Sequence, residues 1–212
     1  MSAAKDEVLA RIRNALGGRP APIRSSAPRE YRVAGVLSFS ERIELFIDRL
    51  HDYDAVVHRA SRHEIAAAIA GALEARAKRG LLVPLGIRSE WLPPGFLFQR
   101  DTELSYDEID RSEGVLTGCA GAIALTGTIV LRHSESEGRR ALTLIPDYHL
   151  CVVYEQQVVE TVPEAIEQVS AYARSPITTV SGPSATSDIE MTRVKGVHGP
   201  RTLEVILVSD AR

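Results

Sequence analysis

A loop rich in serine and glycine follows a short apolar segment, residues 177–180, which is predicted to be a strand. In an open α/β sheet, ligands lie beyond the carboxyl ends of the strands. Backbone N–H groups and hydroxyls of small residues at that place suit a phosphate or a carboxylate. A tight turn leading into the capping box Ser187-x-x-Glu190 is the plainer interpretation, and the sequence leaves both open. The loop residues that could bind an anion are Ser181, Gly182, Ser184 and Thr186.

A second segment, residues 195–201, places a histidine between two glycines and two cations. Lys195 or Arg201 could balance the charge of an anion. His198 could orient the anion or carry a proton, which makes it the candidate catalytic residue. An anion that leaves water needs several charge-assisted hydrogen bonds, so we expect this segment and the serine-rich loop to share one pocket. The alternative is a chain reversal in which Gly196 and Gly199 provide backbone freedom and His198 bonds only to the backbone.

A glycine flanked by two threonines interrupts the apolar run at residues 122–131. Glycine inside a strand marks a bend, or the close approach of a ligand or of another part of the backbone. The bend is the plainer explanation. As a hypothesis, Thr126, Gly127 and Thr128 form a third wall of the anion pocket.

No motif in the sequence indicates a metal or a cofactor bound by this chain. His63-Glu64 begins an HExxH-like string, but residue 67 is alanine and the second ligand is missing. The glycine patterns of dinucleotide and P-loop sites and the GxSxG of hydrolases do not occur. Cys119 and Cys151 are too few for an iron–sulfur cluster, which needs about four cysteine ligands. Their apolar neighbours predict small buried side chains.

The elements that must position these residues alternate between strand and helix. Residues 1–36 are predicted to be an arm, with a helix at 4–16 and a Pro/Ser/Arg-rich linker, and residues 37–212 a single α/β domain. The patterns Ser38-x-x-Glu41 and Ser61-x-x-Glu64 predict the starts of two helices. The run at 139–146, Arg-Arg-Ala-Leu-Thr-Leu-Ile-Pro, is one of several β-rich runs within 114–159 that predict hairpins or an antiparallel extension. The expected fold class is α/β, with three α-β-α layers, a mixed, mostly parallel sheet and a β-hairpin extension.

Charge and hydropathy exclude several classes of function. The net charge is −3, yet residues 1–32 carry seven Lys or Arg against three Asp or Glu, so the arm is basic and the domain acidic. Aromatic residues are only 5% and none lies among the arginines of the arm, which argues against single-stranded nucleic acid. We expect the arm to contact its own domain or a partner. No apolar run is long enough for a membrane span and no secretory signal is present, so a cytoplasmic location is expected.

Several of these segments together resemble one known family. The strings TGCAGAIALTGTIVL, RALTLIPDYHLCVV and SGPSATSDIEMTRVKGVHGPRTLEVILV are similar to the LUD domain of the lactate-utilization protein C family. The resemblance implies the NagB/RpiA/CoA-transferase-like fold. It also implies a cytoplasmic part in oxidising L-lactate to pyruvate, beside two iron–sulfur partner proteins that would carry the clusters.

One departure from the family pattern bears on activity. Members commonly have Glu or Asp directly before the Thr/Ser-Gly-Thr tripeptide, where this sequence has Leu125. We therefore expect an accessory subunit that binds a small anion, more than a self-sufficient enzyme. The alternative is an independent enzyme of the CoA-transferase or cycloligase class that acts on a phosphorylated or CoA-linked small molecule.

Overall fold

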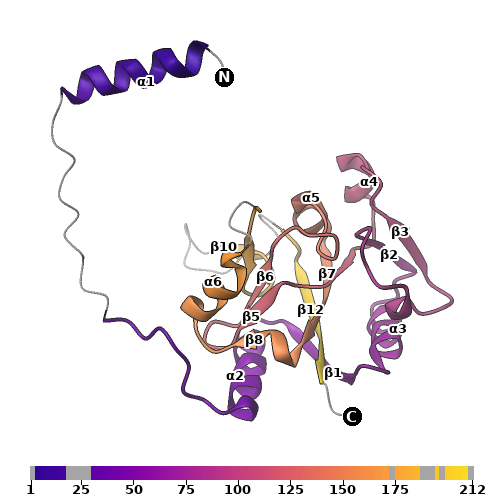
Figure 1. The fold of residues 1–212 in the computed structure, drawn as a ribbon. Coiled ribbons are helices and arrows are strands. Elements are labelled where there is room, and N and C mark those ends of the chain that lie inside the picture. Colours follow the sequence, from indigo (N-terminus) through magenta and orange to yellow (C-terminus); the bar gives the residue numbers. More distant parts are fainter. Residues whose placement is uncertain (1–2, 18–29, 172–174, 187–193, 196–198, 210–212) are drawn as a thin grey trace. The chain divides into compact units, whose positions relative to one another are not determined.

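The computed structural model describes residues 3–17, 30–171, 175–186, 194–195 and 199–209 (Figure 1). The chain divides into two compact units, Met1–Tyr31 and Arg32–Arg212. The first contains helix α1 (Ala3–Leu16), in agreement with the helix predicted for residues 4–16. No helix within the described ranges is long and apolar enough to cross a bilayer.

The main sheet of the second unit has six strands, all parallel, in the order β1-β12-β7-β4-β2-β3. Its central strands β7 and β12 are almost continuously apolar and buried, as expected for parallel strands covered on both faces. The α/β class and the parallel sheet predicted from the sequence are confirmed. The strands are β1 (Val56–Ser61), β2 (Gly80–Val83), β3 (Leu97–Arg100), β4 (Val115–Thr117), β7 (Tyr148–Tyr154) and β12 (Thr202–Ser209).

A second sheet is mixed and has the order β8-β5-β6-β9. Strands β5 (Gly121–Ile123) and β6 (Thr128–Leu131) form an antiparallel hairpin, which confirms the predicted β-hairpin extension. β4 and β7, from the same β-rich range 114–159, are instead parallel strands of the main sheet. β8 (Val158–Val159) pairs with β5 in parallel, and β9 (Thr178–Val180) pairs with β6 antiparallel. The short strands β10 (Ala185–Thr186) and β11 (Val194–Lys195) form a separate antiparallel pair.

Helices cover the two faces of the main sheet. α2 (Phe39–Asp52) buries Ile43, Phe46 and Leu50 against alternate residues of β12, such as Val205, and against the second sheet. α3 (Ile65–Ala75) packs its buried residues against the other residues of β12, such as Ile206. The alternation along β12 thus divides the core into two halves, one under each helix.

Three helices of the domain begin at a capping box. Capping boxes start α2 at Ser38, α4 (Tyr106–Asp110) at Ser105 and α6 (Val162–Ser170) at Thr161. α3 differs from the prediction. It begins at Ile65, and the Ser61 hydroxyl donates to the Glu64 carboxylate in the turn before it. Two short 3₁₀ segments are η1 (Ser89–Trp91) and η2 (Glu155–Gln157).

The prediction of a β-rich run at residues 139–146 is wrong, because this segment is helical. Helix α5 (Arg140–Leu144) occupies it, and its Leu142 is fully buried. A short apolar run does not distinguish strand from helix by itself, and Pro146 confines this one to little more than a turn. The correction matters because α5 carries a cation to the cavity described below.

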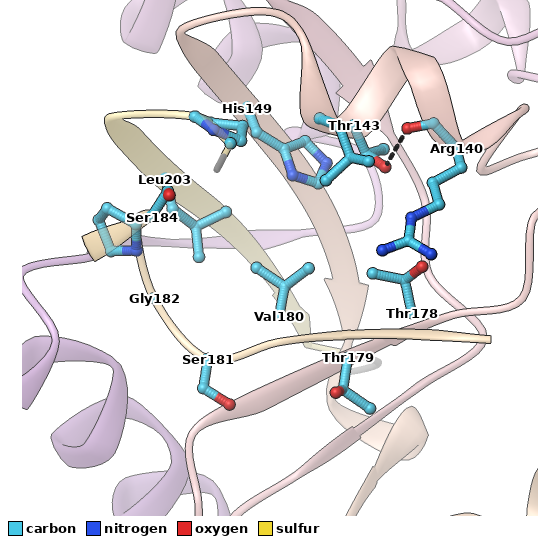
Figure 2. A pocket seen from close by; sticks show the side chains of 14 residues that line it. Arg140, Thr143, His149, Thr178, Thr179, Val180, Ser181, Gly182, Ser184 and Leu203 are labelled. Carbon is cyan, nitrogen blue, oxygen red and sulfur yellow. Dashed lines mark hydrogen bonds between the residues drawn. The ribbon is translucent and has the colours of Figure 1, made fainter. Parts of the chain in front are cut away.

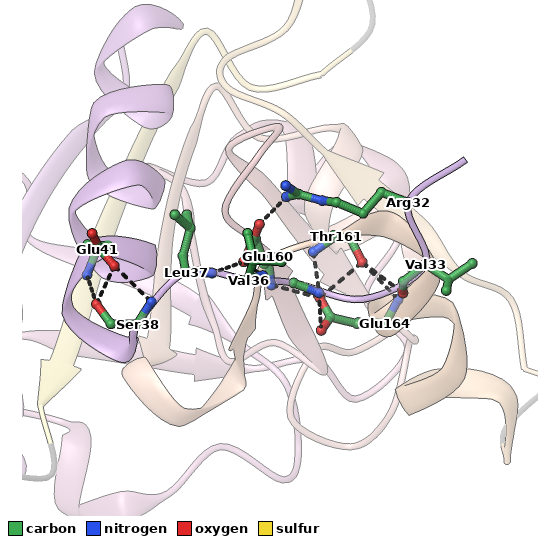
Figure 3. A network of polar contacts seen from close by, with 10 residues as sticks. Arg32, Val33, Val36, Leu37, Ser38, Glu41, Glu160, Thr161 and Glu164 are labelled. Carbon is green, nitrogen blue, oxygen red and sulfur yellow. Dashed lines mark hydrogen bonds and ion pairs between the residues drawn. The ribbon is translucent and has the colours of Figure 1, made fainter. Parts of the chain in front are cut away.

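The start of the second unit is fastened to the domain by a buried carboxylate (Figure 3). Glu160 is 1% exposed and accepts hydrogen bonds from the backbone N–H of Val36 at 2.6 Å and of Leu37 at 2.7 Å. The Arg32 guanidinium forms an ion pair with the same carboxylate. The Gly35 N–H donates to Glu164 at 3.0 Å. All but the Leu37 contact lie before residue 37, where the sequence placed the start of the domain.

Candidate functional site

A cavity of about 340 Å³ lies between the second sheet and the amino-terminal ends of β7 and β12 (Figure 2). Its walls come from α5, β7, β9 with the loop after it, and the segment before β12. The lining residues are Arg140, Thr143, Leu144, His149, Thr178, Thr179, Val180, Ser181, Gly182, Pro183, Ser184, Gly199, Pro200 and Leu203.

The serine-rich loop lines this cavity, but the strand before it lies in a different sheet from the one predicted. β9, which precedes the loop, is an edge strand of the second sheet and not part of the parallel sheet. The cavity is beside the first residues of β7 and β12, where His149 and Leu203 lie. The general preference for the carboxyl edge of a parallel sheet therefore does not explain this site.

The two predicted loop segments lie together. The Ser184 N–H donates to the Pro200 carbonyl at 2.8 Å. β10 and β11 continue this contact, with Ala185 opposite Lys195. The Ser184 amide, which the sequence argument offered to an anion, is therefore already used within the protein.

The predicted residues divide into those that line the cavity and those that do not. Ser181, Gly182, Ser184 and Gly199 line it. Arg201 is exposed and forms an ion pair with Asp147 at 3.6 Å. For Thr186 and Lys195 the structure describes the backbone strands only, while Gly196 and His198 lie outside the described residues, as does the predicted cap Ser187-x-x-Glu190.

Gly182 has a structural reason to be glycine. Its φ is +85°, a left-handed conformation, and a Cβ atom there would lie 2.4 Å from Cβ of Tyr53 at the end of α2. The backbone of the loop therefore packs directly on α2. This contact fixes the part of the cavity wall that the loop forms.

The threonines of the predicted third wall stand behind the loop. The Thr126 and Thr128 hydroxyls are 2.7 Å apart, and the Thr128 hydroxyl is 2.7 Å from that of Ser181. Gly127 has φ +56°, and a Cβ there would meet the backbone of Arg49 at 2.9 Å. The glycine thus serves a bend and a close backbone approach. Thr126 and Thr128 do not line the cavity themselves, and Thr128 is linked to its wall by the hydrogen bond with Ser181.

Sequence reasoning missed the cation of the cavity. Arg140 lies on the exposed side of α5 and makes no ion pair with an acidic residue in the described part of the chain. Within the described ranges, the residues that line the cavity include no aspartate or glutamate. The guanidinium in Figure 2 faces the cavity with Thr178 beside it. A cation without a neighbouring carboxylate favours an anionic ligand.

His149 is the second group that the sequence analysis missed. It is 1% exposed, and its Nε2 is 2.8 Å from the Thr117 hydroxyl on β4. That hydroxyl donates to the Cys151 sulfur at 3.7 Å, so Nε2 is the donor toward Thr117. The only signal in the sequence was a titratable residue inside an apolar strand.

A second histidine, His133, orients the Thr178 hydroxyl on β9. Nδ1 of His133 is 3.1 Å from the Gly138 carbonyl, which can only accept, so Nδ1 carries the proton. In the neutral ring Nε2 then accepts from the Thr178 hydroxyl at 2.8 Å.

Among the described residues no cluster of three or more His, Cys, Asp or Glu side chains could hold a metal ion. The groups facing the cavity therefore suit anion binding and proton exchange.

Comparisons with known proteins agree with this architecture. The family model of the LUD domain matches residues 87–208. The chain is 50% identical to lactate utilization protein C of Deinococcus radiodurans over 208 residues, which cover 97% of this chain and 95% of that protein. It is 33% identical over 116 residues to lactate utilization protein C of Shouchella clausii, covering 52% and 50% of the two chains. A crystal structure of a DUF162 family protein from Deinococcus radiodurans matches 82% of this chain and 99% of its own, with a TM-score of 0.72 and 47% identity.

Proposed function

Because this chain belongs to the LUD domain family and, within it, to the lactate utilization protein C family, we propose that it is a component of lactate utilization that binds a small anion in the Arg140 cavity. The nearly full-length similarity to a lactate utilization protein C carries the first half of this proposal. The charge of the cavity supports the second half.

The anion proposed is a small carboxylate such as L-lactate or pyruvate. A carboxylate that enters the cavity loses water, and charge-assisted hydrogen bonds worth about 1.5–3 kcal/mol each must replace it. Arg140 supplies the charge, and Ser184 lies on the loop that lines the cavity, whereas the side chains of Thr179 and Ser181 point away from the guanidinium (Figure 2). His149 would orient the anion or exchange a proton with it.

In this proposal the oxidation of L-lactate takes place on other chains. L-lactate oxidation to pyruvate removes two electrons, and we propose that two iron–sulfur partner proteins accept them. Two cysteines in the whole sequence support this division, because one cluster needs about four cysteine ligands. Leu125 supports it as well, since it stands where the family pattern has an acid. The chain would act as an accessory subunit that holds the anion.

Replacement of Arg140 with glutamine tests the site. We expect binding of L-lactate or pyruvate to weaken by about 10-fold or more, because one charge-assisted hydrogen bond is worth about 1.5–3 kcal/mol and 1.4 kcal/mol is tenfold. Isothermal titration calorimetry measures the loss. Arg111→Gln, at an exposed arginine that does not line the cavity, is the matched control. Equal affinity of the two variants would place the anion elsewhere.

Growth on L-lactate tests the role in the cell. A strain without this protein should fail to grow on L-lactate as sole carbon source, and the wild-type chain should restore growth where Arg140→Gln does so poorly. Purification of the tagged wild-type chain from such cells should recover two iron–sulfur proteins. Normal growth of the deletion strain would refute the proposed function.

A further inference from the structure

The only two cysteines of the sequence lie side by side in the structure, although 32 residues separate them. Cys151 is in β7 opposite Thr117, the last residue of β4. Cys119 follows two residues after Thr117, beyond the end of β4. Both sulfurs belong to the core under α2.

The contacts of the Cys151 sulfur place it beside the chain that leads to Cys119. The Cys151 sulfur donates to the Gly118 carbonyl at 3.5 Å and accepts from the Thr117 hydroxyl at 3.7 Å. It therefore contacts both residues that precede Cys119. The Cys119 thiol is near enough to lower the pKa of Cys151, and the Cys119 sulfur is 3.4 Å from Oε1 of Gln157. Cys119 follows the end of β4, so no ladder of β4 holds it at a fixed distance from Cys151.

The two thiols differ in their access to solvent. Cys151 is fully buried, whereas Cys119 is 7% exposed and lines two clefts. One cleft, of about 160 Å³, is formed with Trp91, Gly118 and Tyr154, and the other, of about 400 Å³, with Glu137 and Gln168. Cys119 lines both clefts, whereas Cys151 has no exposed surface and lines neither of them.

We infer that Cys119 and Cys151 form a reversible intramolecular disulfide when a hydroperoxide reaches Cys119 from these clefts. The Cys119 thiolate attacks the peroxide oxygen, the O–O bond breaks, and a sulfenic acid and hydroxide result. The Cys151 thiolate then attacks the Cys119 sulfur and displaces the second hydroxide. The two hydroxides take up the two thiol protons, so two thiols and one hydrogen peroxide give one disulfide and two waters.

The proximity of the two thiols favours a thiolate on one of them. The interaction with Cys119 lowers the pKa of Cys151 despite burial, with further help from His149 and Thr117, and the pKa of Cys119 is raised. The thiolate is the nucleophilic form, and a proton that passes from Cys119 to Cys151 places it on the cleft side.

A disulfide would also change the neighbouring hydrogen bonds. Thr117 donates to the Cys151 sulfur and is bonded to His149, which lines the Arg140 cavity. A disulfide sulfur carries no charge and accepts hydrogen bonds only weakly, so Thr117 would lose its acceptor. Oxidation at the clefts would thus reach His149 through one hydroxyl.

Intact-mass spectrometry of the wild-type chain tests the inference. After treatment with hydrogen peroxide we expect a monomer lighter by the mass of two hydrogens, with no thiol left for iodoacetamide. Dithiothreitol should restore both thiols. Cys151→Ala should instead stop at a Cys119 sulfenic acid that dimedone traps, and Cys119→Ser should react far more slowly than the wild type.

Three results would overturn the inference. The first is a wild-type product heavier by oxygen atoms without loss of the two hydrogens. The second is a disulfide found only in dimers. The third is a Cys119→Ser chain that reacts as fast as the wild type, because Cys151 would then be the thiol that meets the oxidant. The wild-type mass decides the first two without any variant, so a poorly folded variant does not leave the question open.

Discussion

Replacement of Arg76 with methionine should destabilise the domain by about 1–3 kcal/mol, less than the loss of a partner in a fully buried ion pair because the Arg76 side chain is 40% exposed. Glu204 lies on the central strand β12 and is 3% exposed. Its two carboxylate oxygens are 2.7 Å from Nε of Arg76 and 2.7 Å from Nε2 of His58. Without Arg76, a charge in the middle of the sheet keeps only the imidazole. Urea denaturation at neutral pH measures the loss.

The same variant should change the dependence of stability on pH. Burial by itself would raise the pKa of Glu204, but the hydrogen bonds from His58 and Arg76 outweigh it and hold the pKa below the ordinary 4.5. A carboxyl group with a lowered pKa contributes stability that is complete above 4.5 and is lost as the pH falls through the folded-state value. In Arg76→Met fewer hydrogen bonds oppose the effect of burial on the pKa of Glu204, so acid unfolding should begin at a higher pH.

Arg79→Met provides the matched control, since Arg79 is exposed and close in sequence. Its effect should stay within about 0.5 kcal/mol, as for most surface substitutions. A loss in Arg76→Met no larger than that of the control would mean that the Glu204 network contributes little. Glu204→Gln separates the charge from the shape, because it should flatten the acid limb of the stability profile.

Replacement of Glu160 with alanine should release residues 32–37 from the domain and lower its stability by about 2–4 kcal/mol. The carboxylate binds two backbone N–H groups and Arg32, and hydrogen bonds to charged groups contribute about 1.5–3 kcal/mol each without being fully additive. Hydrogen–deuterium exchange of Val36 and Leu37 measures the release directly. Both amides should exchange faster by a larger factor than the core of β7.

Gly35→Ala tests the same contact from the other side. A Cβ at residue 35 would lie 2.5 Å from Oε2 and 2.6 Å from Cβ of Glu160, so the backbone would have to leave its position. Glu167→Ala, on the exposed side of α6, is the control and should leave both amides protected. Unchanged exchange at Val36 and Leu37 in Glu160→Ala would show that other contacts hold this segment.

Local signals predicted much of the fold because they act over a few residues. The capping box of Ser38 with Glu41 and the uniformly apolar runs of β7 and β12 are such signals, and the structure has each of them. The pattern at 139–146 failed because a run of four or five apolar residues fits a strand or one helical turn equally well. There the surrounding packing decides.

The site was harder to predict because distant parts of the chain build it. Ser181 and Ser184 could be identified as a loop suited to a ligand, and they do line the cavity. Arg140 and His149 come from α5 and β7, and nothing local to either residue indicates that they face the same space. The parallel-sheet rule also misled the argument about β9, because pairing with β6 placed that strand in the second sheet.

Translation delivers the strands of the main sheet as β1, β2, β3, β4, β7 and β12, but the sheet places β12 between β1 and β7. β1 therefore leaves the ribosome before the other strands of this sheet. Its only described neighbour there, β12, emerges last. Until then α2 and α3 lack the strand whose alternate faces they share. A nascent chain that stops before Thr202 cannot close its core, so it is a substrate for chaperones and proteases and not a smaller working domain.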